Sequence, residues 1–340
     1  MSNDISEFLP KEIRELEWYD NSTLATIDKC NRKGFWKNVY QLPNTPEINT
    51  PNGKIQPKGI AERMGIGAFV GTAFHTALDR YYAPLNSTKT YEQRKIIAFR
   101  ALASKYAELI LEPELAETKY SLPRCIDVLD MYFTRYEEED KWFKVIDTEV
   151  VAVVVIRPKA DEPDFTPFNW IARSDGTIER TRYQDRMVME HKTATSPEQK
   201  LTELVMSRQT EGYCWAMSEF PSEKPIVGIM ANVISIRAAE CDPSKLFFRD
   251  YISKSKYQLA QWRFETIRKV LSWRAINAAA STTPHILQSM QYFTRNTEEC
   301  TRYGRCSFYD LCLHGPQSVD LNNYTANIWN PLYAEKMDPP

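Results

Sequence analysis

Residues 172–194, ARSDGTIERTRYQDRMVMEHKTA, decide how this chain folds and contain its most distinctive side chains. Two runs typical of β-strands, 168–180 and 185–193, flank a turn whose midpoint lies between Arg182 and Tyr183. Folding the chain back at this midpoint gives an antiparallel hairpin in which opposed residue numbers sum to 365. The sequence therefore predicts a hairpin with a defined register.

In that register two carboxylates face each other. Asp175 lies opposite Glu190, with Cβ atoms about 5 Å apart, and Lys192 shares the face of Glu190 because side chains alternate along a strand. Opposed carboxylates repel, so we expect a cation between them, and Mg²⁺ or Mn²⁺ suits carboxylate oxygens and water. Lys192 could stabilise charge on a phosphoryl group or orient and deprotonate a water. A solvated Glu–Lys pair is the alternative interpretation.

A helix predicted over 198–217 follows the hairpin and carries one polar residue on its apolar stripe. This residue is Gln209, four positions before Tyr213. Because an amide buried without a partner costs about 1–3 kcal/mol, Gln209 should face something polar. A functional site and a satisfied core glutamine are both consistent with this position.

The remaining elements predict helices on both sides of a sheet. The Pro-rich residues 41–60 are typical of a loop. Helices flanking a central mixed β-sheet make an α/β fold, and we expect one domain over 21–318, with an N-terminal arm over 1–20 and a tail over 319–340. The expected helices are 21–40 (N-capped by Asn21 or Ser22), 66–82, 91–112, 123–140 and 254–279, and the further strands are 145–156, 225–237 and 245–252.

Composition limits the class of protein. The 340 residues are 43% apolar and 26% charged, which is ordinary for a globular chain. The net charge of −2 is not that of a strongly basic nucleic-acid binder, so any DNA contact must use local basic patches. The longest apolar run, 150–156, is far shorter than the ~20 residues of a membrane span, and residues 1–10 lack the pattern of a secretory signal. We therefore expect a cytoplasmic protein without membrane contact.

Three of the seven cysteines are evenly spaced near the C-terminus, at Cys300, Cys306 and Cys312, and Cys30 is a fourth candidate ligand. Cytoplasmic thiols stay reduced, so metal ligation competes with plain burial. Thiolates suit an iron–sulfur cluster or zinc, with His314 as a possible substitute ligand, and free thiols remain an alternative. The other cysteines are expected to be structural: Cys125, Cys214 and Cys241.

Basic and aromatic residues surround these cysteines. Such a mixture is typical of surfaces that bind single-stranded nucleic acid, although a solvated face is equally consistent with it. The residues are Arg32, Lys33 and Lys37 near Cys30, and Arg295, Arg302, Tyr303, Arg305, Phe308 and Tyr309 around the C-terminal cysteines.

Taken together, the motifs resemble the PD-(D/E)XK nuclease superfamily and in particular its RecB-like branch. They occur in that family's order, as Gly71-x-x-x-His75, Asp175, Glu190-His191-Lys192 and Gln209-x-x-x-Tyr213. The resemblance implies a restriction-endonuclease-like core, and Glu149 resembles the acidic residue of its first strand. It also implies a metal site made by His75, Asp175, Glu190 and the His191 carbonyl, a catalytic Lys192, and Gln209 and Tyr213 as supports for substrate or lysine.

The cysteines resemble a RecB-like subset that includes AddB-type nucleases and the CRISPR-associated nucleases of spacer acquisition. This subset holds a 4Fe–4S cluster with one cysteine before the core and three near the C-terminus. The resemblance implies that Cys30, Cys300, Cys306 and Cys312 hold such a cluster and join the two ends of the chain. The spacing between Cys300 and Cys306, five residues, is longer than in that subset, so zinc remains an alternative metal for these cysteines.

These observations predict a metal-dependent DNA nuclease. The resemblance favours an exonuclease, acting on single-stranded DNA or duplex ends. One alternative is a catalytically weak DNA-binding or recombination accessory protein with a nuclease fold, and another is a zinc-stapled structural protein. The sequence indicates no particular protein partner.

Overall fold

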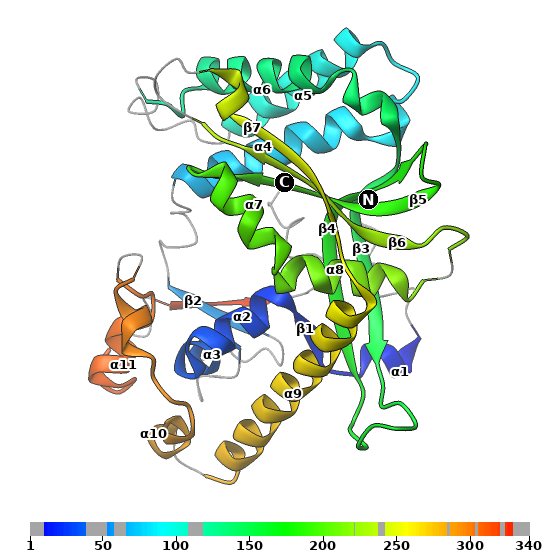
Figure 1. Ribbon diagram of the computed structural model, residues 1–340. Helices are drawn as coiled ribbons and strands as arrows, with labels where there is room; N and C mark the ends of the chain where they lie inside the picture. Colours follow the sequence, from blue (N-terminus) through cyan, green and yellow to red (C-terminus); the bar gives the residue numbers. More distant parts are fainter. Residues whose placement is uncertain are drawn as a thin grey trace. The chain divides into compact units, whose positions relative to one another are not determined.

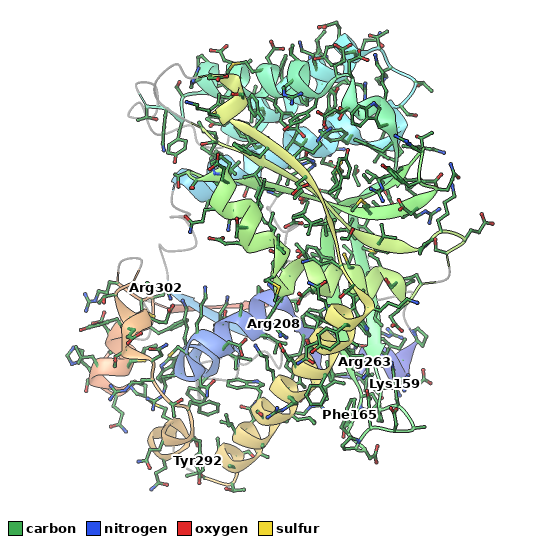
Figure 2. The ribbon with its side chains drawn as sticks, in the orientation of Figure 1. Lys159, Phe165, Arg208, Arg263, Tyr292 and Arg302 are labelled. Carbon is green, nitrogen blue, oxygen red and sulfur yellow. The ribbon has the colours of Figure 1, made fainter. Side chains whose placement is uncertain are left out.

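The computed structural model describes residues 10–38, 53–57, 66–107, 118–220, 222–236, 242–283, 286–302, 305–319 and 324–328 (Figure 1). Their side chains can be followed in Figure 2. The chain divides into two compact units. The sheet unit comprises Met64–Ala152 and Ala172–Arg263, and the terminal unit comprises Met1–Arg63, Val153–Ile171 and Phe264–Pro340.

The sheet unit is built on a mixed β-sheet. β4 pairs antiparallel with β5, β5 pairs parallel with β6, and β6 pairs antiparallel with β7, while β3 pairs with β4 on the other side. This arrangement confirms the predicted α/β fold with a central mixed sheet. The strands are β3 (Phe143–Ile156), β4 (Phe168–Arg180), β5 (Asp185–Thr193), β6 (Ile226–Ile234) and β7 (Phe247–Ser253).

Helices cover both faces of this sheet (Figure 1). α4 (Ile66–Tyr82), α5 (Tyr91–Ala107) and α6 (Leu122–Tyr136) form the main apolar core with one face. The other face carries α7 (Pro197–Val205) and α8 (Arg208–Ser218), which contact β6 and, for α8, also β5. The central strands β5 and β6 therefore have side chains buried on both faces, whereas β3 is largely exposed or half-buried. The core side chains from the sheet include Ile178, Met187, Met189, Met230 and Phe247.

The terminal unit gathers the helices near both chain ends. Aromatic rings hold it together, since the Phe293 ring lies 4.5 Å from Phe35 and 5.4 Å from Trp273. Its helices are α1 (Lys11–Arg14), α2 (Asn21–Lys29), α3 (Asn31–Asn38), most of α9 (Lys256–Ser281), α10 (Ile286–Ser289) and α11 (Tyr309–His314). Short 3₁₀ turns across the chain are η2 (Pro84–Asn86), η4 (Glu139–Trp142), η5 (Pro243–Lys245), η6 (Met290–Tyr292) and η7 (Thr297–Cys300).

Three short strands lie outside the predicted elements. β1 (Trp18–Asp20) falls within the expected N-terminal arm and pairs parallel with the first residues of β4. β2 (Gly53–Pro57), in the segment predicted as a loop, pairs antiparallel with β8 (Tyr324–Ile328). The loop prediction was therefore wrong for β2, while the expected domain boundaries stay a prediction.

Two helices that the sequence predicted as continuous are each broken in two. Between α2 and α3, Cys30 has an extended backbone (φ −161°, ψ 111°), so the helix predicted over 21–40 ends and restarts there. The N-cap is also different from the prediction, because Asp20 accepts the hydrogen bond of Thr23 N at 2.6 Å. The helix predicted over 198–217 is broken between α7 and α8.

Other helix and strand predictions agree closely with the structure. The predicted strands 168–180 and 185–193 are β4 and β5, and the predicted helix 66–82 is α4. No helix in the described part of the chain combines the length and apolar character that crossing a bilayer requires.

Candidate active site

The hairpin has the predicted register. Main-chain pairing of β4 with β5 runs from Arg180–Asp185 to Gly176–Met189, so opposed numbers sum to 365. One residue further along, Asp175 uses its side chain instead: its Oδ2 accepts the main-chain N–H of His191 at 2.5 Å. The carboxylate is therefore bound directly to the backbone of β5, next to Glu190.

Helix α4 brings His75 to the same carboxylate. The distance between His75 Nδ1 and Asp175 Oδ1 is 2.9 Å. One turn earlier on the same face of α4, a Cβ atom at Gly71 would lie only 3.0 Å from Thr193 Oγ1. The missing side chain thus lets α4 approach the end of β5, which explains the spacing of Gly71 and His75.

Gly176 permits a second close approach, directly after Asp175. A Cβ atom here would lie 2.6 Å from the carbonyl oxygen of Asp147 on β3 and 2.8 Å from Met189 Cε. Real side chains do not tolerate such a contact with a backbone oxygen. β3 therefore lies against β4 at the position that orients Asp175. Glu149, the acidic residue expected on the first strand, is exposed on β3 with a left-handed backbone (φ 50°).

Glu190 is a buried carboxylate with an adjacent lysine. Only 1% of its surface is exposed, and it forms an ion pair with Lys192. Burial raises the pKa of Glu190 to about 7, although Lys192 acts in the opposite direction. Burial also acts to raise the pKa of Asp175, but the neighbouring His75 outweighs it, so that pKa is lowered. The two carboxylates thus differ in environment: Asp175 contacts His75 and Glu190 pairs with Lys192, while the cation expected between the two carboxylates stays a prediction.

The pKa values of the two histidines are shifted in opposite directions. Burial acts to lower the pKa of His75, but the Asp175 carboxylate more than offsets this and the pKa is raised. Burial lowers the pKa of His191 to about 3, so its ring is neutral. The His191 side chain points to the α4 face of the sheet, where its ring stacks on Tyr82. Only its main-chain groups are directed along the plane of the sheet toward the neighbouring strands.

The donor atoms suit a hard divalent cation, because carboxylate oxygens and an imidazole nitrogen are ligands for Mg²⁺ and Mn²⁺. In the structure these donors are engaged with protein partners: His75 contacts Asp175, and Lys192 pairs with Glu190. Within the described residues, no three acidic, histidine or cysteine side chains converge closely enough to hold an ion. Cation binding would therefore compete with these contacts.

Gln209 and Tyr213 satisfy each other on α8. Gln209 Nε2 donates to Tyr213 OH at 2.6 Å, one helical turn away. Gln209 thus has the polar partner that its position on the apolar stripe predicted. α8 contacts β5, the strand of Glu190 and Lys192. The catalytic role of the pair stays a prediction.

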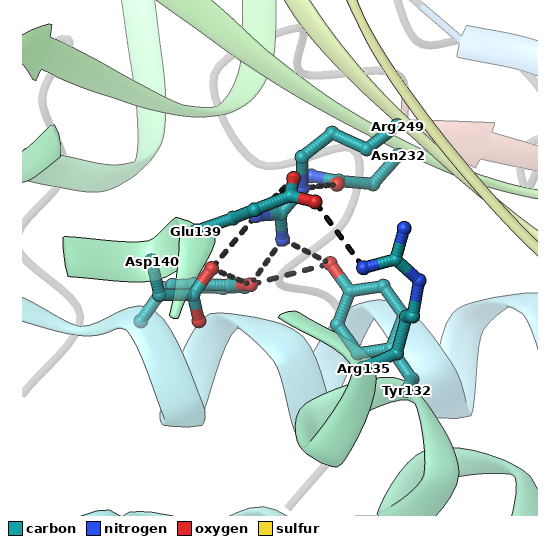
Figure 3. A network of polar contacts seen from close by, with 7 residues as sticks. Tyr132, Arg135, Glu139, Asp140, Asn232 and Arg249 are labelled. Carbon is teal, nitrogen blue, oxygen red and sulfur yellow. Dashed lines mark hydrogen bonds and ion pairs between the residues drawn. The ribbon is translucent and has the colours of Figure 1, made fainter. Parts of the chain in front are cut away.

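The sequence analysis missed a polar network beside the site, which Figure 3 shows. At its centre lies Arg249 of β7, whose side chain is 1% exposed. A signal was present in the sequence: Arg249 alternates with Phe247 and Tyr251 on an apolar strand face. An arginine on an apolar strand face has two explanations: either the face is exposed to solvent, or the arginine is buried and paired with polar groups.

In the terminal unit, the four candidate cysteines share one region. Cys30 Sγ accepts a hydrogen bond from Asn296 N (3.4 Å), and Cys312 Sγ accepts one from Trp36 Nε1 (3.3 Å). Burial raises the pKa of Cys312, and the nearby thiols of Cys30 and Cys306 raise it further. Burial, then Cys306 and Cys30, raise the pKa of Cys300 in the same way. The thiols are thus electrostatic neighbours, yet no three of the described ligand side chains are grouped closely enough for an ion.

The cysteines predicted to be structural lie apart from this region where they are described. Cys125 on α6 is fully buried and contacts Tyr106 OH at 3.0 Å, and Cys214 on α8 is fully buried as well. Burial raises the pKa of Cys125 to about 11 and that of Cys214 to about 12, so both stay protonated. Cys241 lies outside the described residues, as does Tyr303.

A comparison with protein families agrees with the fold. The model of the PD-(D/E)XK nuclease superfamily matches residues 21–313, which is most of the chain. The chain belongs to the PD-(D/E)XK nuclease superfamily. The family relationship indicates a nuclease fold, DNA as the class of substrate and the Mg²⁺ or Mn²⁺ chemistry typical of these proteins. No curated protein matches the chain.

Proposed function

We propose that this protein is a metal-dependent deoxyribonuclease of the RecB-like branch. The observation that carries the proposal is the convergence of Asp175, Glu190 and Lys192 at the open end of the β4–β5 hairpin. His75 joins them from α4, as the Gly71-x-x-x-His75 motif of that branch requires. Members of the family with these groups hydrolyse phosphodiester bonds.

In this proposal His75, Asp175, Glu190 and the His191 carbonyl hold Mg²⁺ or Mn²⁺. The bound ion would polarise the phosphoryl oxygen and lower the pKa of a bound water. The chain itself positions two of these ligands. The His191 N–H holds the Asp175 carboxylate, and Glu190 is buried next to Lys192, which a bound cation would replace as the partner of the carboxylate. Lys192, once free of Glu190, can stabilise negative charge on the phosphate. Gln209 and Tyr213 on α8 support substrate or lysine.

We further propose that Cys30, Cys300, Cys306 and Cys312 hold a 4Fe–4S cluster in the terminal unit. The electrostatic proximity of the four thiols supports this proposal, as do the contacts of Cys30 with the chain that leads to Cys300. The donor set, four thiolates, is the one such clusters prefer. Zinc is the alternative occupant, because it also accepts four thiolates.

The substrate is DNA, and the RecB-like resemblance favours cleavage from an end. Basic side chains near the thiols support contact with a single strand, and the described ones are Arg32, Lys33, Lys37, Arg295, Arg302 and Arg305. Both single-stranded DNA and duplex ends fit this proposal.

One experiment tests the function. The protein is purified without oxygen, its visible spectrum is recorded, and end-labelled single- and double-stranded DNA is incubated with it in Mn²⁺, in Mg²⁺ and in EDTA. We expect mononucleotides or short products in the metal ions and none in EDTA. We also expect more activity in Mn²⁺, because it tolerates the imidazole ligand His75 better. Asp175→Asn should be inactive, and equal cleavage by this variant would contradict the assignment.

A further inference from the structure

His191 contacts the site through its main chain and the α4 side of the sheet through its ring. Its main-chain N–H holds Asp175 Oδ2, while the residue is only 2% exposed. Among the residues that the structure describes, neither nitrogen of this ring has a hydrogen-bond partner. The orientation of this ring therefore depends on its ring neighbours, Tyr82 (5.7 Å, interplanar angle 14°) and His75 (6.2 Å, 83°).

Tyr82 is held in turn by its hydroxyl group. This oxygen lies 3.2 Å from Asp140 Oδ1, 3.2 Å from Tyr132 OH and 3.0 Å from Arg249 Nη2. The phenol thus has one end in a polar network and its face against His191. The Tyr82 ring therefore cannot move away from His191 without displacing the hydroxyl oxygen from these three contacts.

Arg249 organises this network (Figure 3). It donates to Asn232 Oδ1 at 2.6 Å, to Asp140 Oδ1 at 2.9 Å and to Tyr132 OH at 3.1 Å. In the sheet register, His191 pairs with Asn232, and Asn232 pairs with Arg249. His191, Asn232 and Arg249 therefore form one polar row across three strands, on the face covered by α4 and α6.

Burying such a row of polar side chains in a core costs desolvation free energy. Burying an arginine and a carboxylate requires nearly complete pairing, and well-packed apolar residues at the same positions are often equally or more stable. Here the row ends at the residue whose backbone binds Asp175, and the network reaches that residue through the ring of Tyr82. Its cost is consistent with a role in geometry rather than in stability.

We propose that Tyr82 and the Arg249 network position the active site, by holding His191 where its main-chain N–H binds the Asp175 carboxylate. Tyr82 is in this view a positioning residue that acts through His191. The consequence for cleavage rests on the proposed nuclease function, but the effect on the His191–Asp175 contact does not.

The test compares three variants of the full-length protein. Tyr82→Leu removes the stacked ring, and Tyr82→Phe keeps the ring but loses the three hydroxyl contacts. Tyr106→Phe is the matched control: its hydroxyl, in the same core, lies 3.0 Å from both Tyr120 O and Cys125 Sγ and has no link to His191. Loss of a buried tyrosine hydroxyl is thus compared with and without a connection to the site.

The first measurement is hydrogen exchange of the His191 amide in the metal-free protein, relative to the Ile229 amide on β6. We expect at least tenfold faster relative exchange in Tyr82→Leu, an intermediate increase in Tyr82→Phe, and no change in Tyr106→Phe. If the relative exchange in both Tyr82 variants equals that of Tyr106→Phe, the proposal is wrong, whatever the general loss of stability.

The second measurement is the affinity for Mn²⁺, together with kcat and KM for DNA. We expect about fivefold weaker binding and a lower kcat at unchanged KM in Tyr82→Leu, with partial recovery in Tyr82→Phe. Wild-type protein that neither binds Mn²⁺ nor cleaves DNA would contradict the proposed function alone, since the exchange comparison still decides the positioning role. Active protein whose Mn²⁺ affinity and kcat are unaffected in Tyr82→Leu would overturn the proposal.

Discussion

Lys192 differs from an ordinary surface lysine because its partner is buried. Glu190 is almost fully covered, and burial raises its pKa although Lys192 lies beside it. A divalent ion could replace Lys192 as the positive charge next to the Glu190 carboxylate. In the proposed mechanism, the Lys192 ammonium group would then be able to contact the phosphate of a bound substrate.

We therefore predict that Lys192→Ala reduces cleavage by at least about 100-fold, since this is the usual effect of removing a charge that stabilises a transition state. Binding of Mn²⁺ should persist, because the variant keeps both carboxylates. Lys200→Ala is the control, as Lys200 pairs with Glu203 on the surface of α7. DNA cleavage assays and Mn²⁺ titrations measure both effects. Undiminished cleavage by folded Lys192→Ala protein would remove the lysine from the mechanism.

Gly176 supports a second prediction at the scale of a single residue. Gly176→Ala places a methyl group against the Asp147 carbonyl oxygen, and backbone must move to relieve the contact. We expect a loss of about 1–3 kcal/mol in the free energy of unfolding, as for other overpacked sites, and lower activity because Asp175 is adjacent. Urea unfolding measures the first effect.

Gly67→Ala is the matched control for this substitution. Its nearest neighbour would be Tyr120 OH at 3.6 Å, an ordinary contact. In a helix the change should leave stability equal or raise it by up to about 1 kcal/mol. If both variants unfold at the same urea concentration, the close approach of β3 does not constrain Gly176.

At the scale of elements, the break between α7 and α8 has an identifiable cause. Lys254 lies buried after β7 and donates to the carbonyl oxygens of Leu204 (2.9 Å) and Val205 (2.6 Å). Both carbonyls lie in the last turn of α7, where the regular helical donors are missing. Leu204 O also accepts from Ser207 N (3.3 Å) and Thr210 Oγ1 (3.2 Å). A distant lysine thus ends one helix and allows α8 to start in a new direction, with Gln209 and Tyr213 on it.

We predict that Lys254→Met lowers the free energy of unfolding by about 1–3 kcal/mol, because the Val205 carbonyl oxygen loses the donor that Lys254 supplies and the Leu204 carbonyl oxygen loses one of its donors. The flexible apolar side chain fills similar space, so lost hydrogen bonding dominates. Lys256→Met, two residues later on the exposed start of α9, should change stability by less than about 0.5 kcal/mol. Equal chemical denaturation midpoints for the two variants would argue against the capping role.

These elements also show what a sequence can predict. The hairpin was predictable with its register because strand alternation and the turn are local, and Asp175 and Glu190 followed from it. The α7–α8 break was not, because it depends on Lys254, about fifty positions away. The His191–Asn232–Arg249 row was missed for the same reason, since a parallel pairing of β5 with β6 has no local signature.

At the scale of the whole molecule, the chain ends are linked through Cys30. Arg32 N donates to Thr294 O at 3.0 Å, and Asn296 N donates to the Cys30 thiol, so the start of α3 is tied to the segment before Cys300. Cys30 and Cys300 are about 270 residues apart in the sequence. A cluster bound by both would cross-link the terminal unit, whose segments are far apart along the chain.

The last prediction follows from this separation. In the chain-entropy treatment of cross-links, closing a loop of this length stabilises the folded state by up to about 5 kcal/mol, which is comparable to the whole stability of many domains. Cys30→Ser should therefore lose both the visible absorbance of the cluster and resistance to limited proteolysis. Cys125→Ser should keep the colour, since Cys125 is buried in the sheet unit beside Tyr106. A coloured and protease-resistant Cys30→Ser protein would exclude Cys30 as a ligand and direct attention to His314.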